Sequence, residues 1–132
     1  MPQKGNIKDE KHGKEIWFAY GAVTGANGVS ANGIATAHFL EDKTYVIDVQ
    51  MNMYAPERGT LYDVWLSNGD PKSPISIGHL TEGIRPTRQV LRFETTKDLR
   101  DRLTVAITTG KSSAHLVPGE VVATGLMKVT KR

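Results

Sequence analysis

The strictest pattern in this sequence is an alternation of apolar and polar side chains over residues 44–53. Every second residue is large and apolar, and the residues between them are mostly polar. Side chains of an extended chain point alternately to opposite faces, so this period of two is typical of a half-buried antiparallel strand. The residues that should face a protein core are Tyr45, Ile47, Val49, Met51 and Met53.

A second extended stretch, residues 59–70 (GTLYDVWLSNGD), carries large side chains on both faces. Tyr62 and Val64 lie on one face, and Asp63 and Trp65 lie on the other. A strand covered from two sides is usually central in its sheet. We therefore predict that this is the middle strand, with Tyr62 in the core, its hydroxyl bonded to the backbone, and Trp65 covering the other face.

Short apolar segments separated by Gly, Pro, Asn and Ser fill the rest of the chain. Two Asn-Gly pairs in residues 24–33 favour turns that need positive φ. The segments predict eight short strands and an all-β, antiparallel β-sandwich. Their approximate ranges are 15–23, 34–40, 44–53, 59–66, 75–80, 88–94, 103–109 and 120–129.

Two local features modify this pattern. Thr95 precedes Asp98 by three residues, which predicts one short helical turn over Thr95–Arg102 with Leu99 as its apolar anchor. Gly125 interrupts the last strand and indicates a bulge or a close approach of two backbones.

The size of the chain fits one domain. Of its 132 residues, 39% are hydrophobic and 23% charged. We predict a single β-sandwich domain over residues 15–132, preceded by a polar, flexible leader or tether at residues 1–14. The sequence contains no apolar run of about 18 residues and no secretory signal pattern.

Charge and cysteine content exclude several functions. The chain has no cysteine, so disulfides, thiolate metal sites and cysteine nucleophiles are excluded. Its formal net charge of +3 comes from basic residues interleaved with acidic ones. Nucleic-acid binding usually requires clustered basic residues, so we expect no nucleic-acid partner.

A family resemblance follows from the order of short motifs. The elements Tyr-x-x-Trp-Leu, Gly-x-Leu and Val-x-x-Thr occur here with Tyr62, Trp65, Gly78 and Thr108. Together with the sequences GIA at 33–35 and PGE at 118–120, they resemble the extracytoplasmic C-terminal domain of anti-sigma-K-type factors. The resemblance implies a non-catalytic β-sandwich module in the periplasm or at the cell surface, commonly tethered to a membrane.

The chain departs from that family in two respects. The glutamate that follows the threonine of Val-x-x-Thr is missing, because Thr108 is followed by Thr109, Gly110 and Lys111. The sigma-binding helices and the transmembrane segment of the family are not in this sequence. We therefore expect no anti-sigma activity, and membrane contact only through a segment absent from this chain.

Histidine and methionine side chains are the only candidate metal ligands besides carboxylates. His38 and His79 would be the first to test, and Met51 and Met53 offer thioethers suited to Cu(I). No recognisable ligand spacing joins them, and the methionines lie on the apolar face of a strand. We predict no metal site and no cofactor.

Catalytic motifs are equally weak. Ser112 and Ser113 lie beside His115 in a glycine-flanked loop, without the strand-to-helix turn that exposes a nucleophile. Asp98 and Asp101 are expected to pair locally with Arg100 and Arg102 on the predicted short helical turn, as solvated charges and not as an acid–base pair. We predict that the protein is not an enzyme.

Three functions stay open. The leading hypothesis is a non-enzymatic module that acts through contacts with an unknown protein partner, with an exposed Trp65 as one possible contact. The alternatives are a small His/Met metal-binding or redox module, and a structural subunit of a surface assembly, which would make homo-oligomers possible. A basic stripe is a further possible contact for an acidic partner or anionic lipid: Arg85, Arg88, Arg92, Arg100 and Arg102.

Overall fold

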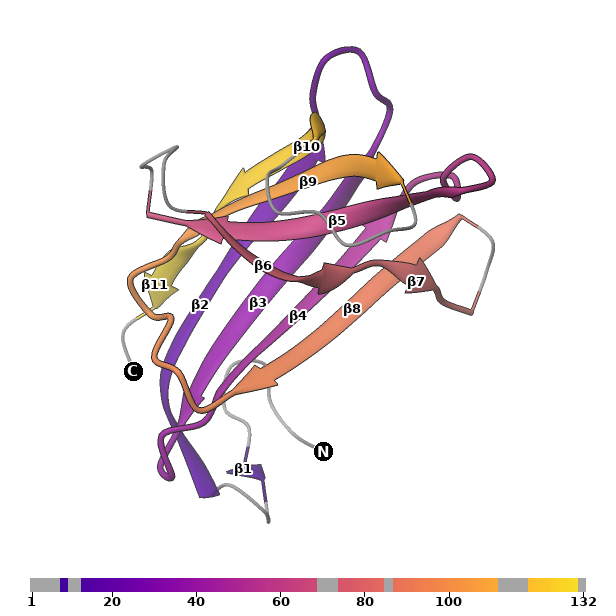
Figure 1. Cartoon of the computed structure of the whole chain (residues 1–132). Coiled ribbons are helices and arrows are strands. Elements are labelled where there is room, and N and C mark those ends of the chain that lie inside the picture. The colour runs from indigo at the N-terminus through magenta and orange to yellow at the C-terminus, as the bar shows by residue number, and fades with distance from the viewer. Residues whose placement is uncertain (1–7, 10–12, 69–73, 85–86, 112–118, 131–132) are drawn as a thin grey trace.

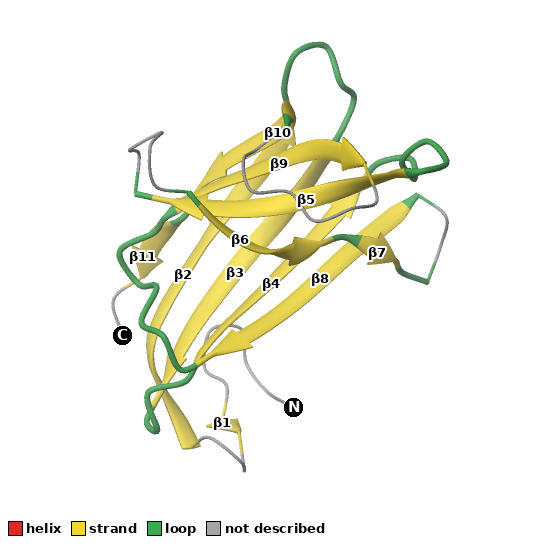
Figure 2. Ribbon diagram, viewed as in Figure 1, coloured by secondary structure: helices red, strands yellow, loops and turns green. Residues whose placement is uncertain are grey.

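The structure of the chain is a computed structural model that describes residues 8–9, 13–68, 74–84, 87–111 and 119–130. All regular secondary structure in these ranges is β-strand (Figures 1 and 2). None of the described residues forms a helix of the length and hydropathy needed to cross a bilayer. The all-β class predicted from the sequence is confirmed.

Eleven strands are present in the described ranges, and all eight predicted strands are among them. Three were not predicted as separate strands: β1, β7 and β11. The strands are β1 (Lys8–Asp9), β2 (Gly13–Gly25), β3 (Asn32–Leu40), β4 (Tyr45–Asn52), β5 (Thr60–Ser67), β6 (Ile75–His79), β7 (Thr81–Glu82), β8 (Arg88–Thr95), β9 (Thr104–Lys111), β10 (Glu120–Leu126) and β11 (Lys128–Thr130).

The strands form one antiparallel sheet that is almost closed into a barrel. The strand order is β6-β5-β9-β10-β2-β3-β4-β8-β7, and β1 and β11 pair with other parts of β2. The two ends of this order are consecutive in sequence, since only Leu80 separates β6 from β7. β6 pairs with β5 and β7 pairs with β8, so one segment joins both edges of the sheet (Figure 1).

Gly78 lies in β6, two residues before Leu80, where this closing segment changes its partner strand. Its φ is +124°, a conformation that side chains with a Cβ rarely adopt. The β5–β6 pairing has a β-bulge next to it: Val64 pairs with Gly78 and Trp65 with Ser76, so Ile77 is the extra residue on β6. Such bulges bend a strand and increase its twist. The kink lets residues 75–79 follow β5 and residues 81–82 follow β8.

The predicted sandwich is therefore not what the structure shows. In a sandwich two separate sheets face each other, whereas here one continuous hydrogen-bonded path encloses the core. Residues 59–70 were also expected to form the middle strand. β5 instead lies second in the strand order, beside β6 and β9. The prediction that it is covered on both faces is confirmed, because residues 63–66 are all buried.

The inward faces of the strands fill the barrel. The alternation predicted for residues 44–53 is confirmed, since all five apolar residues of that face are buried. They pack with inward residues of the neighbouring strands, among them Ala19, Val23, Ala37, Phe39, Leu66, Val105 and Ile107. The barrel interior is thus a side-chain core.

Gly125 makes the close approach that the sequence indicates. A Cβ at this position would lie 2.4 Å from the carbonyl oxygen of Ala22 on β2. The absence of a side chain lets β10 and β2 pair at this point, where Gly125 faces Val23.

The predicted helical turn at Thr95–Arg102 is wrong. Thr95 ends β8, and its hydroxyl oxygen accepts the Lys97 N–H rather than capping a helix. The Asp98 carboxylate accepts the Arg100 N–H in the same way. These local bonds offer the backbone an alternative to helix. The expectation that Leu99 anchors the segment is confirmed, because Leu99 is buried in the core.

The predicted leader is described only in part. β2 begins at Gly13, and Lys8 and Asp9 of β1 pair with Lys14 and Gly13. Residues 1–7 and 10–12 lie outside the described residues.

Candidate functional site

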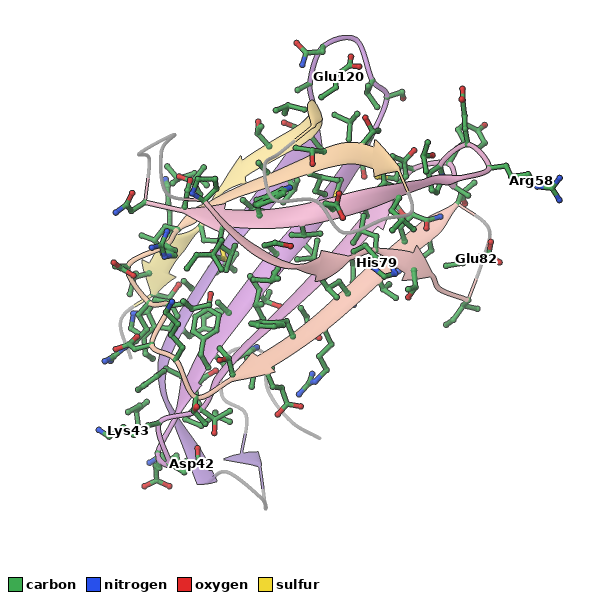
Figure 3. All side chains as sticks on the ribbon, viewed as in Figure 1. Asp42, Lys43, Arg58, His79, Glu82 and Glu120 are labelled. Carbon is green, nitrogen blue, oxygen red and sulfur yellow. The ribbon has the colours of Figure 1, made fainter. Side chains whose placement is uncertain are left out.

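Loop 96–103, which connects β8 to β9, lies at the end of the barrel where β2 and β4 begin and β3 ends. The β3–β4 turn is at the same end, as the labels of Asp42 and Lys43 in Figure 3 show, whereas Glu120 lies at the opposite end. Leu99 holds the loop to the core. The flanking residues Asp98, Arg100 and Asp101 are thereby positioned over the barrel end.

Three aromatic side chains come to this end from three adjacent strands. Trp17 of β2 and Tyr45 of β4 have ring centroids 6.3 Å apart. The guanidinium of Arg100 lies over the ring of Phe39 from β3, 3.9 Å from its centroid. A cation over an aromatic face is attracted by the negative charge density of that face.

Arg100 is also bound to Asp98. Its Nη2 lies 2.7 Å from Oδ2 of Asp98, and its Nε and backbone N–H both lie 3.0 Å from Oδ1. These bonds favour the charged forms of both groups. Hydrogen bonding to Arg100 lowers the pKa of Asp98, with smaller contributions from the charges of Arg100 and Lys43, and the same contact raises the pKa of Arg100.

A depression of about 510 Å³, open to solvent, is lined by Trp17, Asp98, Arg100 and Asp101. Asp101 is exposed, and the structure shows no ion pair or hydrogen bond of its carboxylate with a described residue. The depression therefore combines an indole, an internally neutralised ion pair and an accessible carboxylate.

Tyr45, whose ring lies near Trp17 at this end, has a hydroxyl without a hydrogen-bond partner among the described residues. Tyr45 is 0% exposed, and its hydroxyl makes no hydrogen bond to any described residue. Burial raises the pKa of Tyr45, and the negative charges of Asp101 and Asp98 raise it further. The hydroxyl is thus protonated at neutral pH and within electrostatic range of the two carboxylates that line the depression. We call Trp17, Tyr45, Asp98, Arg100 and Asp101 the end site.

The residues of the family-like motifs lie elsewhere and have structural contacts. Trp65 is only 4% exposed, and its Nε1–H donates to the hydroxyl of Thr108 at 2.9 Å. An exposed Trp65 contact is therefore contradicted. The Tyr62 hydroxyl donates to the carbonyl oxygen of Tyr54 at 3.0 Å, as predicted. Gly78 is the kink described above.

The two candidate histidines are not brought together. His38 lies on β3 and His79 on β6, with four strands between them in the sheet order. The Nδ1 of His38 is in hydrogen-bond contact with the buried carboxylate of Glu15. Met51 and Met53 are core residues. Among the residues that the structure describes, no three His, Asp or Glu side chains form a group that could hold a metal ion.

The arginines of the expected stripe are dispersed. Arg92 binds Asp48 on β4 at 3.0 Å, and Arg88 binds Asn52 at 3.1 Å. Arg100 belongs to the end site and faces Asp98. No continuous basic stripe is formed by these three residues. Arg85, Ser112, Ser113 and His115 lie outside the described residues.

Sequence reasoning missed the end site as a unit. It assigned Asp98 and Arg100 to a local pair, which is confirmed, but it did not connect them with Trp17 or Tyr45. One signal was available: the period-two pattern places both aromatic residues on inward faces close to a strand end. The sequence did not indicate that loop 96–103 lies over the ends of those strands.

Comparison with protein-family models, curated proteins and solved structures gives no match to this chain. The resemblance to the outer domain of anti-sigma-K-type factors therefore stays a prediction.

Proposed function

We propose that this protein is a non-enzymatic binding module whose end site contacts a protein partner. The observation that supports the proposal most directly is the depression at the barrel end, with an indole, an arginine and an accessible carboxylate on its wall. Tryptophan and arginine are enriched among the residues that dominate protein interfaces. A rigid barrel presents them with little loss of conformational entropy on binding.

The electrostatics of the end site favour binding over acid–base chemistry. A general acid or base works best with a pKa near the operating pH. Contact with Arg100 lowers the pKa of Asp98, and burial raises that of Tyr45. One group is thus held ionised and the other neutral at pH 7. The exposed Asp98 carboxylate suits a fixed contact to a partner, whereas the buried Tyr45 ring supports the site from below.

The proposed place of action is outside the cytoplasm, in the periplasm or at the cell surface. Its support is the motif resemblance carried by Tyr62, Trp65, Gly78 and Thr108. Attachment to a membrane through a segment beyond this sequence belongs to the same proposal.

Site-specific photo-crosslinking in the cells that make the protein tests the contact. A photoreactive benzoylphenylalanine replaces Lys97, exposed in loop 96–103, or Glu120 at the far end of the barrel (Figure 3). We expect a discrete protein adduct from position 97 that is lost with Trp17→Ala, and none from position 120. Equal adducts at both positions contradict the proposal. So does a hydrolase activity that Ser112→Ala or His115→Ala abolishes.

A second candidate, a subunit of a surface assembly, is favoured by an outward apolar patch. Leu126 of β10 is 60% exposed and follows Gly125, which pairs with Val23 of β2. Ala22, which precedes Val23 on β2, pairs with Ile34 of β3, and Ile34 is 43% exposed. The patch therefore crosses three strands. Contiguous exposed apolar surface of this kind often marks an interaction site.

Light scattering over a concentration series tests self-association through this patch. If copies associate through it, Leu126→Lys should shift the protein to monomer. Thr124→Lys, at an exposed position of the same strand, should not. A wild-type protein that is monomeric at every concentration removes this candidate.

A further inference from the structure

We infer that the outward apolar patch around Ala22 and Ile34 is the contact surface of a two-fold symmetric dimer, so that its partner is a second copy of this chain. The two-fold axis lies in the contact surface, parallel to β2 and β3 and between them. This inference rests on the second candidate function, because it names the partner of the patch and the geometry of the contact. It is carried by two rows of outward side chains whose positions the strand register fixes.

The two rows cross neighbouring strands on paired residues. The first row consists of Lys128 of β11, Tyr20 of β2, Thr36 of β3 and Asp48 of β4. The second row lies two residues further along the strands, with Ala22 of β2 and Ile34 of β3 at its centre. In the first row the large central side chain is on β2, and in the second row it is on β3.

This arrangement of large and small side chains is self-complementary. A two-fold axis along the strands brings β2 of one copy over β3 of the other. Tyr20 then lies over Thr36 of the second copy, and Ile34 lies over Ala22 of the second copy. Each large side chain therefore meets a small one, as in packed sheets whose side chains interdigitate. Tyr20 and Ile34 are 47% and 43% exposed, so the contact removes apolar surface from water in both copies.

Tyr20 is held in place without a partner copy. Its ring is stacked on that of Phe18, with centroids 5.6 Å apart and planes inclined by 28°. Phe18 is itself buried. A side chain that is already fixed loses little conformational entropy on binding. Tyrosines of this kind are enriched among the residues that dominate protein interfaces.

The charges at the two ends of the first row select the direction of the axis. The rotation along the strands places Lys128 over Asp48 of the second copy, twice in each dimer. Lys128 is exposed, and the structure shows no ion pair of its ammonium group with a described residue. Asp48 binds Arg92 at 3.0 Å, and its carboxylate has further lone pairs for a second donor. An axis across the strands also brings large side chains over small ones, but it sets Lys128 over Leu126.

Mixing two charge-reversed variants tests the contact between copies. In a dimer of Lys128→Glu alone, or of Asp48→Lys alone, both contacts join like charges. At low ionic strength each variant alone should therefore dimerise about ten- to thirtyfold more weakly than wild type. In a 1:1 mixture the heterodimer joins opposite charges at both contacts and should recover the wild-type affinity. Sedimentation velocity over a concentration series measures the two variants, their mixture and wild type.

A control variant reverses a charge elsewhere. Lys43→Glu makes the same charge change as Lys128→Glu in the β3–β4 turn at the barrel end (Figure 3) and should dimerise as wild type does. Recovery in the mixture also shows that both variants fold, because mixing does not restore an unfolded chain. The inference is overturned if the mixture stays monomeric while wild type dimerises, or if Lys43→Glu weakens the dimer as much as Lys128→Glu does.

Wild type and Leu126→Lys separate this inference from the candidate function on which it rests. If wild type dimerises and Leu126→Lys is monomeric, but the mixture does not recover, the copies associate through the patch in another arrangement and only the inferred symmetry falls. If wild type is monomeric at every concentration, the surface-assembly candidate falls and the inference falls with it. The proposed contact of the end site is tested by crosslinking and does not depend on either result.

Discussion

The indole of Trp65 donates a buried hydrogen bond of 2.9 Å to the hydroxyl of Thr108. Trp65 lies on β5 and Thr108 on β9, and the bond runs diagonally, because Thr108 pairs directly with Asp63. Two short motifs that are 43 residues apart in the sequence therefore meet in one contact. Its role is to fasten neighbouring strands on the outer face of the barrel.

Removing the acceptor of this bond should destabilise the protein. Thr108→Val leaves a buried indole N–H without a partner, which costs about 1–3 kcal/mol in the free energy of unfolding. In the Thr108→Val protein, Trp65→Phe should lower the free energy of unfolding by less than it does in wild type, because both changes remove the same interaction. Urea denaturation of both single variants and the double variant measures this coupling. Thr124→Val, at an exposed position, is the control and should stay within about 0.5 kcal/mol of wild type.

The close approach of β10 and β2 predicts a strong effect at Gly125. Gly125→Ala places a Cβ 2.4 Å from the Ala22 carbonyl oxygen, which lies on a paired backbone that has little room to move. We expect a loss of about 2–4 kcal/mol, as for other changes that force strands apart. Thermal or urea unfolding measures it.

Gly83→Ala is the matched control for Gly125→Ala. A Cβ there first meets Cγ of Arg88, a flexible side chain, at 3.0 Å. Gly83→Ala should lower the free energy of unfolding clearly less than Gly125→Ala does. Equal losses at the two positions would show that the contact with Ala22 is not the cause.

The faces of the strands could be predicted because they depend on local alternation. Tyr45, Ile47 and Val49 all point inward, as their spacing indicates, since a strand with one buried face must repeat its pattern every two residues. Gly125 was located by another local signal, a glycine that interrupts a strand, which indicated a bulge or a close approach. These features need no knowledge of which strands are neighbours.

The barrel closure depends on pairings that no local pattern encodes. Residues 75–82 divide their hydrogen bonds between β5 and β8, and the kink at Gly78 makes this possible. A glycine in a short apolar run fits a sandwich strand equally well. The end site is non-local in the same way, because Trp17, Tyr45 and Asp98 meet only when β2, β4 and loop 96–103 are arranged in space.

Breaking the Asp98–Arg100 ion pair of the end site should raise the pKa of Asp98. Arg100→Gln removes the hydrogen bonds and charge that lower the pKa of Asp98, so that pKa should rise toward its ordinary value. A carboxyl group with a lowered pKa stabilises the fold above its unfolded pKa and loses that contribution as the pH falls. The variant should lose less stability on acidification. Carboxyl-carbon NMR of Asp98 checks the shift, and its pKa staying unchanged in Arg100→Gln would contradict the assignment.

That pair should contribute little to stability at neutral pH. Both side chains are well exposed, at 39% for Arg100 and 50% for Asp98, so solvent screens their attraction. We expect Arg100→Gln to cost about 0.5–1 kcal/mol in the free energy of unfolding, part of it from the lost contact with Phe39. A loss above about 2 kcal/mol would mean that Arg100 also holds loop 96–103 to the core.

The raised pKa of the Tyr45 hydroxyl predicts that the fold loses stability at alkaline pH. Its pKa is raised in the folded state above the ordinary value of 10.0. A group of this kind stabilises the fold fully below its unfolded pKa and loses that contribution as the pH rises toward its folded pKa. Above about pH 10 the wild type should therefore lose up to about 1.4 kcal/mol per pH unit from this residue alone.

Tyr45→Phe removes the titrating group and should flatten that fall. At pH 7 this variant should be neutral or slightly stabilising, because the lost hydroxyl has no hydrogen-bond partner among the described residues. Tyr54→Phe removes a tyrosine that is 79% exposed and should leave the alkaline fall as it is in wild type. Urea unfolding at a series of pH values compares the three proteins, and parallel curves for Tyr45→Phe and wild type would show that the hydroxyl is not buried unpaired at the barrel end.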